Sequence, residues 1–162
     1  MWSNMKKWMA KDRGTRRLLL EAWWYLAWAR ILKMLPFSKV APSLGTPMVE
    51  TTHVLEPSHA SEMRRIARAV YTMSRHTFWE SKCLVRAIAA MKMLERRKIG
   101  STLYLGTARD DNGKMIAHAW LRSGPFYITG AEEMNKFKVV GIFGKTIRTP
   151  QHRGEAMHGH EG

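Results

Sequence analysis

Hydrophobic and polar residues alternate with two different periods along the chain. Residues 18–37 are apolar nearly all round, which predicts a packed helix. In residues 58–76 and 81–99 the apolar positions recur every three to four residues, which predicts two further helices up to Gly100. From residue 101 the period changes to two, which predicts strands over residues 101–109, 114–122, 125–130 and 137–143. Helices followed by an antiparallel meander predict an α+β fold, with helices packed on an antiparallel sheet.

Residues that favour turns and helix ends separate these elements. Ser58 and Ser81 are placed to cap the second and third helices, and Gly100 is placed to end the third. The Asn-Gly pair at 112–113 predicts a tight hairpin between the first two strands. Residues 38–57 hold several prolines without any periodicity, and we therefore predict a linker there.

The composition narrows the class of protein. Lysine and arginine number 27 against 13 acidic residues, which gives a formal net charge of +14 and suggests an anionic partner. A single cysteine, Cys83, excludes an intrachain disulfide and cannot supply a zinc site of clustered thiolates. No phosphate-binding glycine loop is present, so we expect neither a metal nor a cofactor.

Four arginines fall largely off the apolar face of the second predicted helix: Arg64, Arg65, Arg68 and Arg75. They could form an anion-binding surface, or they could only solvate the outer face of the helix. The pattern does not decide between these alternatives.

Cys83 lies where a helix would stabilise a thiolate. With Ser81 as the cap, Cys83 is the second helical residue, close to unpaired N–H groups and to the positive end of the helix dipole. Lys82 adds a further positive charge, and the thiolate is the nucleophilic form of cysteine. The alternative is a buried structural cysteine, which is common for a lone thiol.

His118 lies in the middle of an otherwise apolar predicted strand. Strand alternation places it on one face with Ile116 and Trp120. A histidine on an apolar face is often only a core residue. A cysteine at a helix start facing a histidine on a strand is, however, the arrangement that papain-like and transglutaminase-like enzymes share, with a third group that orients the ring.

Two segments carry a resemblance to a known family. The sequence WESKCLVRA at 79–87 and the sequence AHAWL at 117–121 resemble the transglutaminase-like leader peptidases of lasso-peptide biosynthesis, in the microcin-processing superfamily. The run RLLLEAWWYLAWARILKMLPF, with the later Leu44-Gly45, resembles the N-terminal region of the stand-alone peptidase of the split type. The resemblance extends over about residues 17–144.

The resemblance implies a papain/transglutaminase-like core and a cysteine peptidase, with Cys83 as nucleophile and His118 as general acid/base. The substrate would be a lasso-peptide precursor, whose leader is removed before a separate cyclase closes the ring. A separate leader-recognition domain protein would deliver the precursor. On this basis we divide the chain into a basic segment with an apolar helix (1–37), a linker (38–57), the peptidase domain (58–147) and a disordered tail (148–162).

The third catalytic group departs from the family pattern. The family's orienting Asp lies about twelve residues after the His, where this chain has Gly130. If the turn centres on Gly124, Gly130 faces His118 and offers no side chain. Two arrangements remain open: Glu132 substitutes for the Asp, or a backbone carbonyl orients the ring of His118.

Three functions are compatible with these observations. The first is the leader peptidase, and the second is acyl transfer on the same fold, as in transglutaminases or arylamine acetyltransferases. The third is a non-enzymatic basic binding module, although no nucleic-acid motif is present and we expect no nucleic-acid partner. We expect a cytoplasmic protein whose segment 18–37 docks on the catalytic domain, on a partner or on the inner membrane face, without spanning the bilayer.

Overall fold

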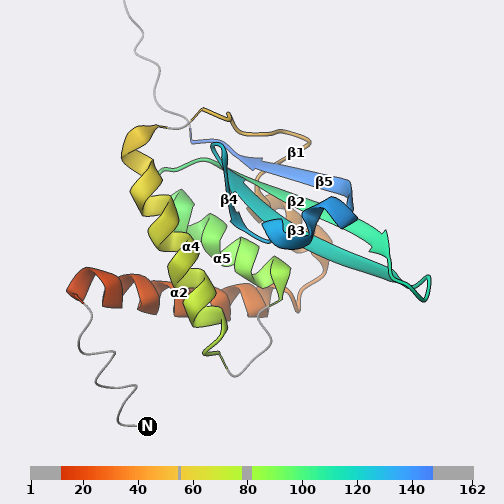
Figure 1. Ribbon diagram of the computed structural model, residues 1–162, viewed down its shortest axis with the longest axis horizontal. Helices are drawn as coiled ribbons and strands as arrows, with labels where there is room; N and C mark the ends of the chain where they lie inside the picture. Colours follow the sequence, from red (N-terminus) through yellow and green to blue (C-terminus); the bar gives the residue numbers. More distant parts are fainter. Residues whose placement is uncertain (1–11, 55, 78–81, 148–162) are drawn as a thin grey trace, which may run out of the picture.

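The computed structural model describes residues 12–54, 56–77 and 82–147, and it shows helices packed against one face of an antiparallel sheet (Figure 1). The predicted α+β class is confirmed. The helices are α2 (Arg13–Leu32), α3 (Phe37–Leu44), α4 (Ala60–Ser74) and α5 (Cys83–Arg96), with 3₁₀ turns η1 (Pro57–His59) and η2 (Ala131–Lys136). The strands are β1 (Thr46–Pro47), β2 (Ser101–Arg109), β3 (Met115–Ser123), β4 (Phe126–Thr129) and β5 (Lys138–Lys145).

The sheet follows the order β1-β5-β2-β3-β4, and all four of its pairings are antiparallel. The predicted meander is therefore wrong in its last step, because β5 pairs with β2 and not with β4. Strand β3 pairs with β2 on one side and with β4 on the other, and β5 pairs with the remaining edge of β2. Strand alternation indicates which face a residue occupies but not which edge a strand joins.

Helix α5 lies between α2 and the sheet, and this position explains its composition. Its buried residues surround most of the helix: Val85, Ala87, Ile88, Ala89, Ala90, Met91, Met93 and Leu94. The helix ends earlier than predicted, with left-handed Lys98 (φ 57°) in place of Gly100. The amides of Lys98 and Ile99 donate to the carbonyls of Glu95 and Leu94, which closes the helix end in a Schellman motif.

Helix α2 packs one face on α4 and α5 and leaves the other exposed. It begins at Arg13, where the Asp12 carboxylate accepts a hydrogen bond of 2.9 Å from the Thr15 amide. The buried face holds Leu18, Leu19, Ala22, Leu26 and Ala29. In the described part of the chain, no helix has the length and apolarity that a membrane crossing requires. One face of α2 therefore packs on the rest of the chain, which is one of the three docking arrangements expected for residues 18–37.

Residues 38–57 hold a helix and a strand, so the predicted linker is wrong. Helix α3 covers residues 37–44, and β1 pairs with β5 through Thr46 opposite Gly144 and Pro47 opposite Phe143. Both elements are too short to produce a visible period. Ser58 lies inside η1, and α4 begins without a side-chain cap, so the capping role predicted for Ser58 is also wrong.

The almost fully buried Arg122 (2% exposed) fastens the segment after β1 to the sheet. Its guanidinium donates to the carbonyl of Thr51 at 2.9 Å and to the hydroxyl of Tyr104 at 3.0 Å, and it pairs with Glu50 at 3.1 Å. This segment is far from β3 along the chain, and the contacts of the buried Arg122 connect the two. The predicted tail (148–162) lies outside the described residues.

Candidate active site

Cys83 is the first residue of α5, one position earlier in the helix than predicted. The N-cap is Lys82, in an extended conformation and without a side-chain capping hydrogen bond, while Ser81 lies outside the described residues. The first N–H groups of a helix have no partner within it, so this end presents donors beside a half-buried thiol. Such donors can stabilise negative charge on a sulfur or on an oxygen of a substrate.

His118 lies on β3, which packs directly against α5. In the β2–β3 register His118 stands opposite Gly106. Its Nε2 lies 2.8 Å from the carbonyl oxygen of Gly130, twelve residues further along the chain. Because a carbonyl oxygen can only accept, Nε2 carries the proton in this contact, and Nδ1 is left as the basic nitrogen of the neutral ring.

Aromatic rings fix the plane of the imidazole. Phe137 stacks at a centroid distance of 4.9 Å and Trp120 at 5.8 Å, with interplanar angles of 30° and 26°. Gly106 makes room for both side chains, since a Cβ there would lie 2.8 Å from the ring of Trp120 and 2.9 Å from the Cβ of Phe137. The sequence pattern gave no sign of Phe137, because its proximity to His118 depends on β5 returning beside β2. Gly106 could have been found from the register of the predicted hairpin between β2 and β3.

Gly130 delivers its carbonyl from a conformation that favours glycine. It is buried in the left-handed region (φ 75°), and a Cβ there would lie 2.6 Å from the carbonyl oxygen of Ala119. A side chain at this position would therefore clash with the backbone of β3. Restoring the family's Asp at position 130 does not fit this structure.

Glu132 lies in η2 with an exposed side chain. Within the described ranges its carboxylate has no hydrogen bond or ion pair, and the contact to His118 comes from Gly130. Of the two arrangements that the sequence left open, the structure contains the carbonyl contact and does not bring Glu132 to the histidine.

Arg86 is a polar residue of α5 that sequence reasoning did not single out. It follows Cys83 by three positions and so lies on the same side of the helix. Its Nε is buried without a hydrogen-bond partner in the part of the chain that is described. The i, i+3 spacing from the only cysteine was the available signal.

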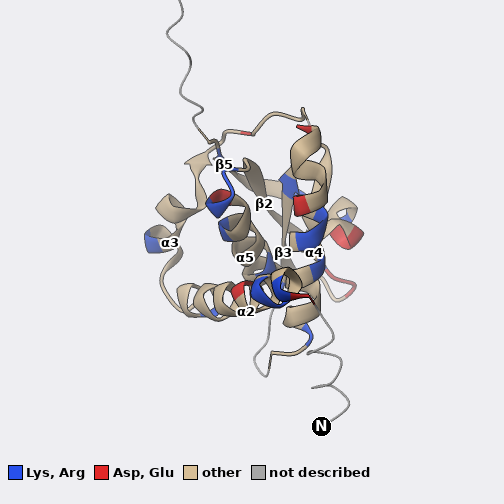
Figure 2. Cartoon of the chain, turned by 90° about the vertical axis from the view of Figure 1, so that its left-hand side faces the viewer, with Lys and Arg blue, Asp and Glu red and all other residues tan. Residues whose placement is uncertain are grey.

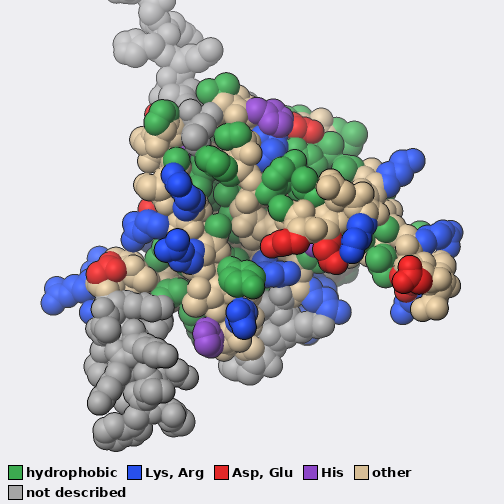
Figure 3. Space-filling view, in the orientation of Figure 1, with side chains coloured by type: hydrophobic (Ala, Val, Ile, Leu, Met, Phe, Trp, Pro, Cys, Tyr) green, Lys and Arg blue, Asp and Glu red, His purple; other side chains and the backbone are tan. Residues whose placement is uncertain are grey.

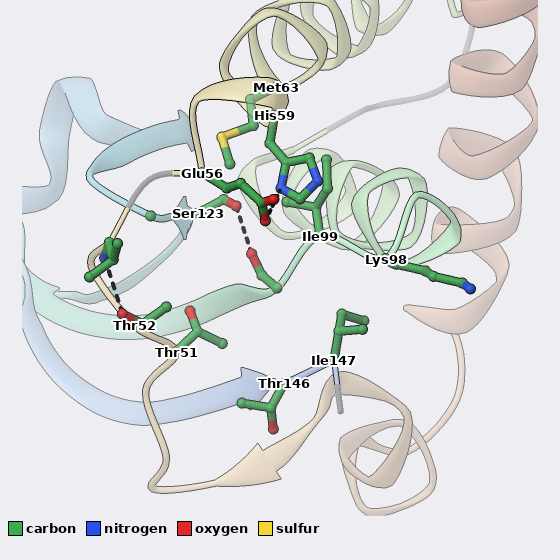
Figure 4. Close-up of a pocket in the computed structure, with 13 residues that line it drawn as sticks. Thr51, Thr52, Glu56, His59, Met63, Lys98, Ile99, Ser123, Thr146 and Ile147 are labelled. Atoms are coloured by element: carbon green, nitrogen blue, oxygen red, sulfur yellow. Dashed lines mark hydrogen bonds and ion pairs between the residues drawn. The ribbon is translucent and has the colours of Figure 1, made fainter. Parts of the chain in front are cut away.

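A separate pocket of about 210 Å³ lies beside the opposite end of α5, where Lys98, Ile99 and Gly100 line it (Figure 4). Glu56 and His59, three residues apart around η1, form an ion pair at 3.8 Å on one wall of it. Neither Cys83 nor His118 lines this pocket. The pocket is therefore distinct from the arrangement around the thiol.

The family model described as the transglutaminase-like superfamily matches residues 22–141, well over half of the chain. The chain belongs to this superfamily, which includes cysteine peptidases and acyl transferases. The match includes the second half of α2 and all of residues 38–57, so these parts belong to the family's unit. No curated protein and no solved structure matches the chain.

Proposed function

We propose that this chain is a cysteine peptidase that removes the leader from a lasso-peptide precursor. Cys83 would be the nucleophile and His118 the general acid/base, and a separate cyclase would then close the ring. The observation that carries the proposal is the His118–Gly130 contact, because it leaves Nδ1 of a ring on β3 as the basic nitrogen while Cys83 begins the helix packed on that strand. The motifs around both residues resemble those of leader peptidases.

The proposed reaction has two steps. The Cys83 sulfur attacks the carbonyl carbon of the bond that joins leader and core, and His118 gives a proton to the departing amine as the C–N bond breaks. Water then attacks the thioester, His118 accepts its proton, and the C–S bond breaks to release the leader and restore the thiol. The free N–H groups at the start of α5 would hold the developing oxyanion.

Gly130 would replace the usual carboxylate in this scheme. Its carbonyl can hold the ring orientation and the tautomer, since both need only an acceptor on Nε2. A carbonyl has no full negative charge to stabilise an imidazolium. The site would thus operate as a Cys–His dyad with a neutral orienting group.

The test uses a short precursor encoded beside the gene of this chain, with its recognition-domain protein. We expect the wild-type chain to separate leader from core, and intact-mass spectrometry to detect the leader as an acyl adduct on Cys83. Cys83→Ala should show neither, with an unchanged thermal melting temperature. Cleavage by Cys83→Ala would remove the peptidase assignment, and an adduct that is resolved only by an added amine would favour acyl transfer.

A further inference from the structure

A groove between α2 and α4 combines an apolar floor with arginines on one wall. It encloses about 190 Å³ and is lined by Thr15, Leu18, Leu19, Arg65, Arg68 and Thr72, together with Ala69. Leu18 and Leu19 are buried among the core residues, whereas Arg65 and Arg68 are exposed. Figure 2 shows the lysine and arginine positions of the two helices beside each other, and Figure 3 shows these side chains gathered over α4. We call this feature the α2–α4 groove.

Most arginines around the groove have no carboxylate partner. Within the described residues, ion pairs are absent for Arg13, Arg16, Arg17, Arg64, Arg68 and Arg75. The acidic groups nearby are already used, because Glu21 and Glu62 both bind Arg97 and the Asp12 carboxylate caps α2. Glu62 also pairs with Arg65 at 3.1 Å, so Arg68 is the lining arginine that has no ion pair among the described residues. The groove therefore retains an uncompensated positive potential.

A second hollow continues the groove along α4. It encloses about 390 Å³ and is lined by Tyr71, Thr72, Arg75 and His76, so Thr72 borders both hollows. From Thr77, just after α4, only six residues lead to Cys83 at the start of α5. The second hollow therefore lies at the end of α4 from which the chain continues to α5.

We propose that the α2–α4 groove, together with the hollow that continues it, binds an acidic segment of the peptide substrate, upstream of the bond that Cys83 attacks. Aspartate or glutamate side chains would pair with Arg68 and Arg75, and an apolar side chain would rest on Leu18 and Leu19. Arginine suits this ligand because its planar group binds a carboxylate through two hydrogen bonds. Naming the substrate as the occupant rests on the proposed function.

The shape of the groove favours a peptide over other polyanions. A bilayer surface is too flat to reach a recessed floor, and a nucleic acid would be bound by stacking on aromatic side chains and by phosphate contacts. The floor here is leucine and alanine. An apolar floor beside arginines matches an acidic peptide that also carries an apolar side chain.

The first experiment is a selection of random 15-residue peptides displayed on phage, with full-length Cys83→Ala protein as the target. We expect the enriched peptides to carry acidic residues next to an apolar one. In Arg68→Glu/Arg75→Glu, their Kd should rise at least about 20-fold. Conversion to lysine at the same two positions should weaken binding less, because charge is kept while the paired hydrogen bonds are lost.

The matched control is Lys114→Glu/Lys138→Glu, which makes the same change in net charge at exposed positions on the sheet. It should change Kd by less than about threefold, because screened charges at a distance contribute little. Enriched peptides without an acidic bias would overturn the proposal, as would an equal loss in both double variants. Displacement of the peptides by a 20-nucleotide single-stranded RNA, lost in the arginine variant alone, would also overturn it and assign the groove to nucleic acid.

The second experiment links a selected peptide to an activated ester and follows acylation of Cys83 in the wild-type chain by intact mass. The attached acidic segment should accelerate acylation, and Arg68→Glu/Arg75→Glu should abolish only this acceleration. Equal acylation with and without the segment would show that the occupant is not the substrate. If no ester acylates Cys83, the proposed function fails, whereas the binding measurement still decides whether the groove binds acidic peptides.

Discussion

The two ends of helix α5 are built in opposite ways. At its start, Lys82 gives no side-chain cap, and the half-buried Cys83 is the first helical residue, at the end where amide groups have no partner within the helix. At its end, a Schellman motif satisfies the last carbonyls, and Arg97 binds Glu21 at 2.8 Å and Glu62 at 2.6 Å. The closed end joins α2, α4 and α5 into one unit, while the open end keeps polar groups available for chemistry.

Electrostatics reinforce the difference between the two ends. The pKa of the Arg97 guanidinium is raised above its ordinary value, chiefly by its hydrogen bonds to Glu21 and against the effect of burial. Arg97 therefore stays charged wherever the protein is folded. At the other end, Arg86 holds a buried Nε without a hydrogen-bond partner among the described residues. Among the described residues, the ion pairs of this helix lie toward its end, whereas its buried nitrogen without a hydrogen-bond partner lies near its start.

The largest expected effect comes from His118→Ala at the open end. General acid/base catalysis contributes about 10²- to 10⁴-fold, so the rate of leader removal should fall by that factor. Alkylation of Cys83 by iodoacetamide near neutral pH should also slow. His53→Ala, at an exposed histidine, is the control and should change neither. Unchanged alkylation in His118→Ala would show that imidazole and thiol do not meet.

Arg97→Met breaks the closed end and should lower the free energy of unfolding by about 2–3 kcal/mol. It leaves the carboxylate of Glu21 without its cation in a partly buried setting and leaves Glu62 with Arg65 alone, and such losses are costly. Arg96→Met, at the exposed neighbour, should cost less than about 0.5 kcal/mol. Urea unfolding measures both. A similar small loss in the two variants would refute the contrast between the ends.

Gly130→Ala tests the orienting carbonyl against a matched glycine. Gly130 and Gly113 share φ 75°, but a Cβ meets the Ala119 carbonyl at 2.6 Å in the first and open space in the second. We expect Gly113→Ala to cost about 1 kcal/mol, from backbone conformation alone. Gly130→Ala should cost about 1–3 kcal/mol more, from the clash, and should also reduce catalysis. Equal losses of stability and activity in the two variants would mean that the backbone of β3 moves enough to accommodate the added methyl group at no cost.

Glu95 makes a pH-dependent contribution to the free energy of unfolding, near the closed end of α5. Burial raises the pKa of its carboxyl, but hydrogen bonds from Lys92 and Lys145 outweigh burial and leave the pKa below its ordinary value. A lowered folded-state pKa stabilises the fold above the unfolded pKa of about 4.3, and this stabilisation is lost as the pH falls through the folded value.

Glu95→Gln should therefore lower the free energy of unfolding at pH 7 by less than about 1 kcal/mol, and the difference should shrink as the pH falls below about 4. Urea titrations at several pH values give the comparison. The control is Glu133→Gln, at an exposed ion pair with Lys136, which should have almost no effect at any pH. A deficit in Glu95→Gln that persists at low pH would exclude the ionised carboxylate as its cause.

The smallest effect is expected for Glu132→Gln. The exposed Glu132 does not contact His118, and the Gly130 carbonyl occupies Nε2. Leader removal should proceed at close to the wild-type rate, as measured by steady-state kinetics. A large fall in kcat with unchanged KM would instead show that the carboxylate reaches the ring during catalysis and that the site is a triad.

The local parts of this architecture could be predicted from the sequence. The first strand was placed correctly at 101–109, and the hairpin at 110–113 has Gly113 in the left-handed region as the Asn-Gly pair indicates. Periodicity also located α4 and α5 and placed Cys83 at a helix start. These features depend on residues close together in the chain, where spacing and turn preferences act directly.

Tertiary structure alone decided the rest. The return of β5 beside β2 and the packing of Phe137 on His118 join residues that no local period connects. The hairpin pattern placed Gly130 opposite His118, but only the tertiary structure decided between its carbonyl and Glu132. The orienting atom is a backbone oxygen, which every residue has, so no residue type could signal it. This carbonyl points at His118 because Gly130 adopts a left-handed conformation against β3. That conformation depends on how the chain after β4 packs on β3.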